Sequence, residues 1–255
     1  MINVLLCGCG GRMGRAVTEA VSNSNALRIV AGVDINASSI GTACSFPVYD
    51  SISDFPDKAD VIIDFSHHSA LASICEYATA HNTPLVIATT GHTDDELALM
   101  KTTAENVAVF FSRNMSIGIN LLVEMSKIAA KTLGIDFDIE IIEKHHNKKL
   151  DAPSGTALMI AEELAELRGD TEFVYDRHSV RQQRSTNEIG IHSVRGGTIV
   201  GEHDVIFAGN NEIITLSHSA TSREIFANGA VKAAEFIVTK QSGIYDMSDV
   251  INQKK

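Results

Sequence analysis

Residues 140–157, which read E-I-I-E-K-H-H-N-K-K-L-D-A-P-S-G-T-A, bring together the side chains best suited to proton transfer. His145 and His146 carry imidazole groups, which exchange protons near neutral pH, and lysines on both sides add positive charge. Pro153 and Gly155 then indicate a helix start, whose first turn offers unpaired N–H groups to a carboxylate or phosphate. The segment therefore predicts a binding site for a small, negatively charged substrate that takes up a proton.

The two adjacent histidines are expected to have different roles. If the strand that precedes them extends far enough, alternation places Glu143 and His145 on one face and Lys144 and His146 on the other. Hydride delivered to a conjugated carbon leaves a carbanion or enamine that must be protonated, and His145 and Lys149 are the predicted catalytic donors. A cation beside them also stabilises developing negative charge.

The residues that follow are expected to bind the substrate. Pro153 suits the first turn of the helix because that position needs no backbone donor. The N–H groups of Gly155 and Thr156, with the Thr156 hydroxyl, are predicted to hold a carboxylate. An ordinary helix cap is the alternative explanation of the same residues.

A metal site at His145 and His146 is the other chemistry to consider. Two histidines beside carboxylates can bind a metal ion, but the sequence has neither H-E-x-x-H nor a cysteine-rich companion set. We therefore expect no metal.

A glycine-rich loop, G-C-G-G-R-M-G at residues 8–14, follows an apolar run and precedes a helix-like stretch. Such glycines permit a tight turn and let the backbone approach a pyrophosphate. The strict G-x-G-x-x-G spacing fails, because Met13 occupies the sixth position and the third glycine is Gly14. Asp34 ends the next apolar run, where an acidic side chain accepts hydrogen bonds from ribose hydroxyls. Loop and acid predict a dinucleotide site rather than a structural turn, with binding residues Gly8, Cys9, Gly10, Gly11, Arg12, Met13 and Asp34.

The residue after Asp34 bears on the choice of cofactor. Ile35 brings no positive charge to the 2′-phosphate of NADPH, which favours NADH. Arg12 and Arg15 are candidate phosphate partners, although a solvated helix face explains Arg15 equally well.

Two further turns each follow an expected strand. Ligands of open parallel sheets bind beyond the carboxyl ends of the strands, so these turns are candidate walls for the nicotinamide and its ribose. Simple strand-to-helix turns are the alternative. The predicted cofactor contacts are Ala88, Thr89 and Thr90 in A-T-T-G, and Ser112, Arg113, Asn114 and Met115 in S-R-N-M-S.

Short apolar runs alternate with helix-like stretches in the first half of the chain. This pattern predicts an α/β fold whose parallel sheet is covered on both faces. Later strand-like runs joined by short turns predict a smaller α+β domain with a mixed sheet. The expected strands are 2–7, 28–33, 61–65, 85–88, 107–111, 137–142, 189–194, 198–208 and 212–217, and the expected helices 12–22, 69–80, 94–104, 117–133, one after Pro153, and 223–240.

These elements predict two domains. Residues 1–115 are expected to form a Rossmann-like, dinucleotide-binding domain to which a C-terminal helix in 226–255 returns. Residues 116–225 are expected to bind the substrate and to form oligomer contacts.

Composition limits the partners and the location of the protein. A chain of 255 residues with 44% hydrophobic residues can bury a good core. A net charge of -11 argues against nucleic acid as a partner. The N-terminus has no charged leader and its apolar run is short, so we expect no membrane association and a cytoplasmic protein. The four cysteines, Cys7, Cys9, Cys44 and Cys75, predict no disulfide framework.

Several motifs, in order along the whole chain, resemble the 4-hydroxy-tetrahydrodipicolinate reductase family, also called dihydrodipicolinate reductases. They are G-C-G-G-R-M-G, A-T-T-G, S-R-N-M-S-I-G-I-N, the segment 140–157, F-A-N-G-A-V and Y-D-M. The resemblance implies a cytoplasmic enzyme of the diaminopimelate route to lysine. Such an enzyme reduces a cyclic dicarboxylate to tetrahydrodipicolinate with NADH or NADPH.

The resemblance also implies roles for residues. It makes His145 a proton donor or acceptor, Lys149 a proton donor, and His146, Gly155 and Thr156 contacts of a substrate carboxylate. It implies a Rossmann domain joined to a substrate domain whose mixed sheet builds a homotetramer. Many members carry a basic residue where this chain has Ile35, which weakens the case for a strong NADPH preference; we predict no exclusive choice.

Three alternatives remain at this point. Another two-domain dehydrogenase of a small carboxylate would share the glycine loop and Asp34, but not both H-H-x-x-K and P-S-G-T. A non-enzymatic NAD-responsive regulator would need the dinucleotide site without acid groups. A metal-dependent hydrolase would use His145 and His146.

Overall fold

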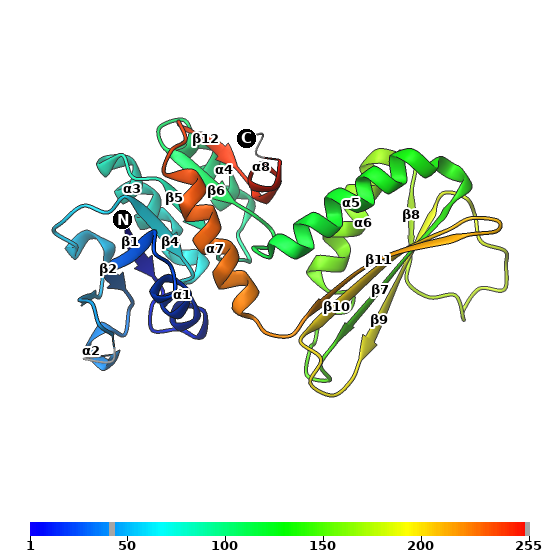
Figure 1. The fold of residues 1–255 in the computed structure, drawn as a ribbon, viewed down its shortest axis with the longest axis horizontal. Helices are drawn as coiled ribbons and strands as arrows, with labels where there is room; N and C mark the ends of the chain where they lie inside the picture. Colours follow the sequence, from blue (N-terminus) through cyan, green and yellow to red (C-terminus); the bar gives the residue numbers. More distant parts are fainter. Residues whose placement is uncertain (41–43, 253–255) are drawn as a thin grey trace. The chain divides into compact units, whose positions relative to one another are not determined.

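The computed structural model describes residues 1–40 and 44–252. The chain divides into two compact units (Figure 1). The first unit comprises Met1–Ser116 and Glu224–Lys255, and the second comprises Ile117–Arg223.

The first unit contains a parallel, seven-stranded sheet in the order β12-β6-β5-β4-β1-β2-β3. Its central strands are buried almost throughout, which explains why they read as continuous apolar runs. The strands are β1 (Ile2–Cys7), β2 (Leu27–Val33), β3 (Val48–Tyr49), β4 (Val61–Asp64), β5 (Leu85–Ile87), β6 (Ala108–Phe111) and β12 (Gly243–Tyr245).

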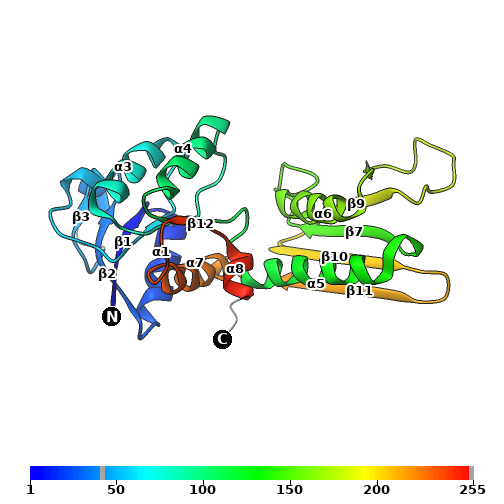
Figure 2. The same ribbon diagram turned by 90° about the horizontal axis from the view of Figure 1, so that it is seen from above.

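Helices cover both faces of this sheet. Helices α3 and α4 lie on one face and α1 and α7 on the other (Figure 2). The Thr93 side chain and Glu96 form a capping box at the start of α4. The helices are α1 (Arg12–Ser22), α2 (Ala37–Ile40), α3 (Leu71–His81), α4 (Asp94–Ala104), α7 (Glu224–Ile237) and α8 (Met247–Ile251), with short 3-10 turns at Ile52–Asp54 and His68–Ala70.

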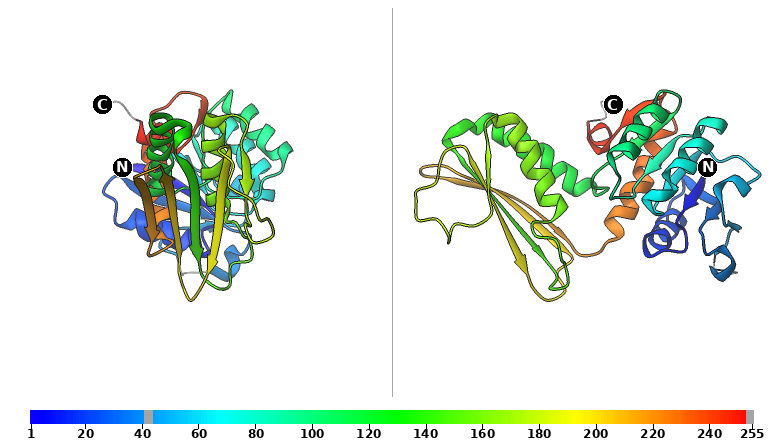
Figure 3. Two further views of the ribbon diagram at one scale, coloured as in Figure 1. Left: turned by 90° about the vertical axis from the view of Figure 1, so that its right-hand side faces the viewer. Right: turned by 180° about the vertical axis from the view of Figure 1, so that it is seen from behind.

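The second unit contains a mixed, five-stranded sheet in the order β11-β10-β7-β9-β8. Strand β7 pairs parallel with β9 and antiparallel with β10. Helices α5 and α6 pack against one face of the sheet (Figure 3). The elements are α5 (Ile117–Leu133), a 3-10 turn (Gly134–Asp136), β7 (Asp138–His145), α6 (Gly155–Arg168), β8 (Glu172–Val174), β9 (Glu188–Arg195), β10 (Gly201–Ala208) and β11 (Ile213–Ala220).

The expected fold class is confirmed: a parallel, Rossmann-like sheet and a second, mixed sheet. The strand expected at 137–142 is longer, because buried and half-buried residues alternate along β7 as far as His145. Strands β3, β8 and β12 were not predicted, since two or three residues are too short to show a period. Within the described ranges, no helix is both long and apolar enough to span a membrane.

Candidate active site

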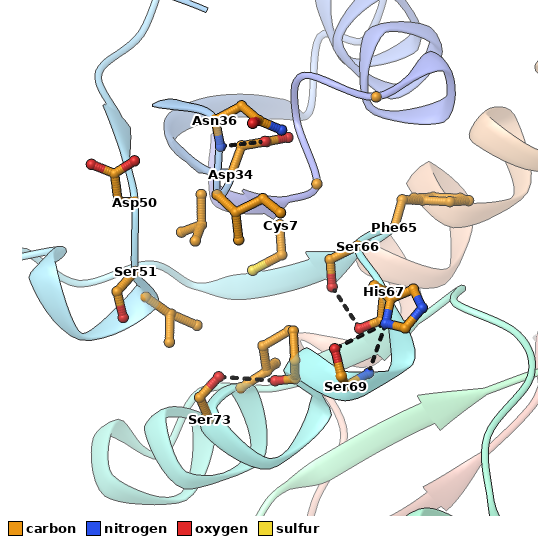
Figure 4. Close-up of a pocket in the computed structure, with 17 residues that line it drawn as sticks. Cys7, Asp34, Asn36, Asp50, Ser51, Phe65, Ser66, His67, Ser69 and Ser73 are labelled. Atoms are coloured by element: carbon orange, nitrogen blue, oxygen red, sulfur yellow. Dashed lines mark hydrogen bonds between the residues drawn. The ribbon is translucent and has the colours of Figure 1, made fainter. Parts of the chain in front are cut away.

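The first unit has a pocket at the point where the order of its strands reverses. From β1, the chain builds the sheet outward through β2 and β3 on one side and through β4, β5 and β6 on the other. In open parallel sheets, ligands bind at such a point, beyond the carboxyl ends of the strands. The pocket has a volume of about 510 Å³ and lies there (Figure 4).

Residues of the glycine loop line the pocket. Gly8 has φ +76°, a left-handed conformation that favours glycine, and a Cβ on it would lie 2.5 Å from the Phe65 carbonyl oxygen. Gly14 lies in the first turn of α1, where a Cβ would lie 2.2 Å from the Gly8 carbonyl oxygen. The late third glycine therefore lets helix and loop pack closely, which is the packing role of the third glycine in the strict spacing.

The Asp34 side chain forms hydrogen bonds that fix the glycine loop. Its carboxylate accepts hydrogen bonds from the backbone N–H groups of Gly10, at 3.0 Å, and Asn36, at 3.0 Å. Ile35 beside it is 87% exposed and brings no charge. Helix α1 begins after Gly11 without a side-chain cap, which leaves its first turn suited to an anion.

The pocket includes only some of the predicted cofactor residues. Gly8, Gly11 and Asp34 line it, whereas the Cys9 side chain is buried against Gly32 and Gly10 donates its N–H to Asp34. Arg12 and Met13 start α1 outside the lining, and Arg12 is exposed.

Other lining residues were missed from the sequence. They follow β3 and β4: Asp50, Ser51 and Ile52 after the first, and Phe65, Ser66, His67 and Ser69 after the second. The rule that ligands bind beyond the carboxyl ends of strands would have found the second group, because it lies at the end of the predicted strand at 61–65 and directly after it.

The A-T-T-G turn after β5 is held by a buried carboxylate. Asp64, 1% exposed, accepts hydrogen bonds from the Thr89 hydroxyl at 2.8 Å and from the Ser66 hydroxyl at 2.5 Å. Burial raises the pKa of Asp64, against the effect of these hydrogen bonds. His92 contacts the Thr89 carbonyl oxygen through Nε2 at 3.0 Å. Ala88, Thr89 and Thr90 lie at the carboxyl edge of the sheet but do not line the pocket described above.

The S-R-N-M-S turn after β6 is fixed by its own polar groups and by α7. Ser112 donates its hydroxyl to the Asn114 carbonyl oxygen at 2.9 Å, and the Ser116 N–H donates to the Asn114 side chain at 2.8 Å. Met115 is buried, and its carbonyl oxygen lies where a Cβ on Gly229 would be, at 1.7 Å. Arg113 is exposed. This turn also lies outside the lining of the pocket.

In the second unit, the face of β7 that turns inward carries Glu143 and His145, as the alternation predicted. His145 lies 2.5 Å from Glu143 through Nδ1, and its ring is 5.3 Å from that of His203 on β10. Burial lowers the pKa of His145, against the raising effect of Glu143. Burial also lowers the pKa of His203 to about 4. Both imidazoles are therefore neutral near pH 7.

Cationic side chains follow the end of β7. Lys149 forms an ion pair with Asp151 at 2.9 Å. His146 lies beyond the strand, half-buried, and Arg223 is 3.5 Å from its Nε2. Arg223 was not predicted as a site residue, because nothing in the sequence near it marks a site.

The start of α6 differs in one respect from the prediction. Pro153, which follows a cis peptide bond, precedes the helix, because Ser154 is the N-cap and its hydroxyl accepts from the Ala157 N–H at 3.2 Å. The prediction of Pro153 in the first turn is therefore wrong. Gly155 and Thr156 are the first two helical residues, and a Cβ on Gly155 would face open space.

The described residues contain no group of three or more His, Cys, Asp or Glu side chains placed to hold a metal ion.

One end of β7 and the start of α6 carry the predicted catalytic and substrate-binding residues, which are His145, His146, Lys149, Gly155 and Thr156. Glu143, Arg223 and Ser154 join them.

Comparison with known proteins points to one family. Residues 2–115 match the family described as dihydrodipicolinate reductase, N-terminus, and residues 118–251 match dihydrodipicolinate reductase, C-terminus. The 4-hydroxy-tetrahydrodipicolinate reductase of Caldanaerobacter subterraneus subsp. tengcongensis is 48% identical over 254 residues, which cover 99% of each chain. That of Clostridium tetani is 47% identical over 253 residues, which cover 99% of this chain and 98% of the relative.

A solved structure agrees with these sequences. The dipicolinate-bound dihydrodipicolinate reductase from Paenisporosarcina sp. TG-14 aligns with a TM-score of 0.80 at 28% identity, over 96% of this chain and 97% of that one. None of the relatives named above is a regulator or a metal-dependent hydrolase. The chain belongs to the 4-hydroxy-tetrahydrodipicolinate reductase family of NAD(P)H-dependent oxidoreductases.

Proposed function

We propose that this protein reduces 4-hydroxy-tetrahydrodipicolinate, through the dihydrodipicolinate that forms from it by loss of water, to tetrahydrodipicolinate in the diaminopimelate route to lysine. One observation carries the proposal: a dinucleotide-type pocket and a cluster of acid and cationic groups belong to one chain whose relatives share this activity by name. The first unit is assigned to the dinucleotide and the second to the substrate.

The residues of the first unit suit a nicotinamide dinucleotide. Asp34 is proposed to accept hydrogen bonds from the adenosine ribose, and the uncapped start of α1 is proposed to hold the pyrophosphate. When bound, the cofactor supplies the hydride. The turns Ala88–Thr90 and Ser112–Met115 are proposed to bound the nicotinamide half, held in place by Asp64 and by α7.

NADH is proposed as the preferred cofactor, with NADPH also accepted. The pocket is lined by the carboxylates of Asp34 and Asp50, and its described lining contains no lysine or arginine. A 2′-phosphate would meet negative charge there, whereas ribose hydroxyls would meet acceptors.

Proton transfer is assigned to Lys149 and His145. Lys149 forms an ion pair with Asp151 and is proposed to donate a proton to the substrate. His145 is neutral near pH 7 and is proposed to accept or relay a proton through Nε2. Both groups lie beside the start of α6, where the substrate carboxylate is proposed to bind.

Substrate carboxylates are assigned to two sets of donors. The N–H groups of Gly155 and Thr156 form the first, at an end of α6 that favours negative charge. His146 with Arg223 forms the second, because the guanidinium suits a carboxylate.

A homotetramer built on the mixed sheet is proposed for the assembly. Helices α5 and α6 leave one face of that sheet without a covering helix among the described residues (Figure 3). Ile213 on β11 is 68% exposed and Val194 on β9 is 44% exposed, which is unusual for apolar strand residues unless another surface covers them. The cytoplasmic location stays a prediction.

The test couples this protein to the preceding synthase reaction, which makes the substrate from pyruvate and aspartate semialdehyde. NADH oxidation that requires both proteins supports the proposal. Binding of NADH without turnover would contradict it and favour the regulator.

A further inference from the structure

Glu143 is a buried carboxylate that the proposed reaction does not use directly. Its side chain is 0% exposed and lies on the same face of β7 as His145. An ionised carboxylate in such a place is costly unless several donors satisfy it. The partners of Glu143 therefore indicate its role.

The first partner is the imidazole of His145. Its Nδ1 lies 2.5 Å from Oε2 of Glu143. An ionised carboxylate accepts hydrogen bonds and donates none, so Nδ1 carries the proton and the neutral ring leaves Nε2 as an acceptor. A Cβ on Gly201 of β10 would lie 3.1 Å from Nε2, so the glycine keeps the approach to that atom open.

The second partner is Arg195 on β9, which keeps Glu143 ionised. Its two terminal nitrogens donate to the two carboxylate oxygens, at 2.8 and 2.7 Å. Burial raises the pKa of Glu143, but hydrogen bonds from Arg195 and His145 outweigh that effect and lower it to about 2. The carboxylate is thus charged across the working range of an enzyme.

The third partner links Glu143 to the start of α6. The Ser154 N–H donates to Oε1 at 3.1 Å, and Ser154 is the residue whose hydroxyl caps the helix. Gly155 and Thr156 follow it directly. One carboxylate therefore contacts both the imidazole and the residue that fixes the proposed carboxylate cradle.

We propose that Glu143 is the positioning residue of this site: it holds His145 with Nδ1 protonated and Nε2 open, in register with the helix start at Ser154. This inference rests on the proposed function. Arg195 acts through Glu143 by balancing its charge.

Other charged groups also face His145. Lys149 approaches from the loop after β7, Arg195 from β9 and neutral His203 from β10. The two cations disfavour a charged imidazole, and Glu143 favours one. Replacement of Glu143 by a neutral residue should therefore lower the pKa of His145. The part of the kcat–pH profile that reports the titration of His145 should then shift to lower pH.

The test compares Glu143→Gln with Glu140→Gln in the whole protein. Glu140 is a matched control, because it is an ion-paired carboxylate of the same strand that contacts Arg184 and His192, away from His145. We expect Glu143→Gln to lower kcat roughly a hundredfold, with the KM for NADH unchanged, and to shift that part of the kcat–pH profile to lower pH. Imidazole nitrogen NMR should show loss of the Nδ1-protonated form of His145. Glu140→Gln should change none of these.

Wild-type kcat in Glu143→Gln, or an equal loss in Glu140→Gln, would overturn the inference. The NMR measurement needs no substrate, so it separates the two proposals. The wild-type protein could prove inactive while its His145 is protonated at Nδ1 and loses that proton position in Glu143→Gln. That result would contradict the proposed function but not the positioning role of Glu143. If Glu143→Gln does not fold, Glu143→Asp is used. It keeps the charge beside Arg195 but shortens the side chain, and a normal kcat in that variant would contradict the positioning role.

Discussion

Lys149 and His145 differ in the charge that each brings to the second unit. Burial lowers the pKa of His145, so its imidazole is neutral near pH 7. Lys149 forms an ion pair with Asp151 at 2.9 Å. In the proposed reaction, Lys149 therefore donates the proton to the substrate and His145 relays one.

Replacement of Lys149 by alanine should lower kcat by roughly a hundredfold to a thousandfold, because an acid and a nearby cation are lost together. The affinity for NADH should stay nearly normal, since Lys149 belongs to the second unit and the proposed pocket to the first. Steady-state kinetics and NADH binding measure the two effects. The exposed neighbour Lys148, changed to alanine, is the control. A normal kcat for Lys149→Ala would remove Lys149 from the acid role.

Replacement of Asp34 by asparagine should weaken NADH binding roughly tenfold, because a neutral amide is a poorer acceptor for ribose hydroxyls. NADPH should lose less, since a negative charge near its 2′-phosphate is also removed. Kd values for both cofactors test this. Asp54→Asn, at an exposed acid outside the pocket lining, serves as the control. Unchanged NADH affinity would contradict the ribose assignment.

At the scale of elements, α7 fixes the turn that follows β6. A Cβ on Gly229 would lie 1.7 Å from the Met115 carbonyl oxygen, so only glycine allows this approach of helix and turn. The F-A-N-G-A-V motif of the sequence thus has a packing reason: it places the S-R-N-M-S turn at the carboxyl edge of the sheet.

Gly229→Ala should lower the free energy of unfolding by roughly 1–3 kcal/mol, because backbone must move to relieve the contact. It should also weaken cofactor binding through the displaced turn. Thermal unfolding and NADH titration measure both effects. Asn228→Ala, at the exposed neighbouring position of the same helix, should leave them unchanged. Equal stability of the two variants would show that α7 and the turn after β6 can move apart without a loss of unfolding free energy.

Most helices and strands could be predicted from the sequence, because their hydrophobic patterns extend over many residues. Helices α1, α4 and α5 have the expected bounds, and the buried strands read as apolar runs. The end of β7 was harder to predict, because Glu143 is polar and its burial depends on Arg195, a residue distant in the chain. Arg223 and the residues after β3 escaped prediction for the same reason: only the folded chain brings them to the sites.

At the scale of the whole molecule, buried histidines make stability depend on pH. His203 is 4% exposed and burial lowers its pKa to about 4. A histidine whose pKa is depressed contributes stability that is present above its ordinary pKa, near 6.5, and is lost as the pH falls through the folded value. Burial shifts His145 and His218 in the same direction. Asp64 acts oppositely, because its pKa is raised.

Stability should therefore fall between about pH 6.5 and pH 4, with His203 contributing roughly 3 kcal/mol. Melting temperatures across this range measure the effect. His203→Gln should show a weaker dependence than the wild type, and His178→Gln, at an exposed loop position, should keep the full dependence. Identical pH profiles for all three proteins would show that His203 is not buried in its neutral form.

In the proposed reaction, hydride passes from the nicotinamide to a cyclic dicarboxylate bound by this chain. The most direct measurement supplies NADH that carries deuterium at the transferred position, with substrate made by the synthase, and analyses the product by mass spectrometry. We expect tetrahydrodipicolinate that carries one deuterium at carbon, in proportion to the NADH oxidised. Oxidation of NADH that leaves the product unlabelled, or no oxidation by a protein that binds NADH, would contradict the proposed reaction.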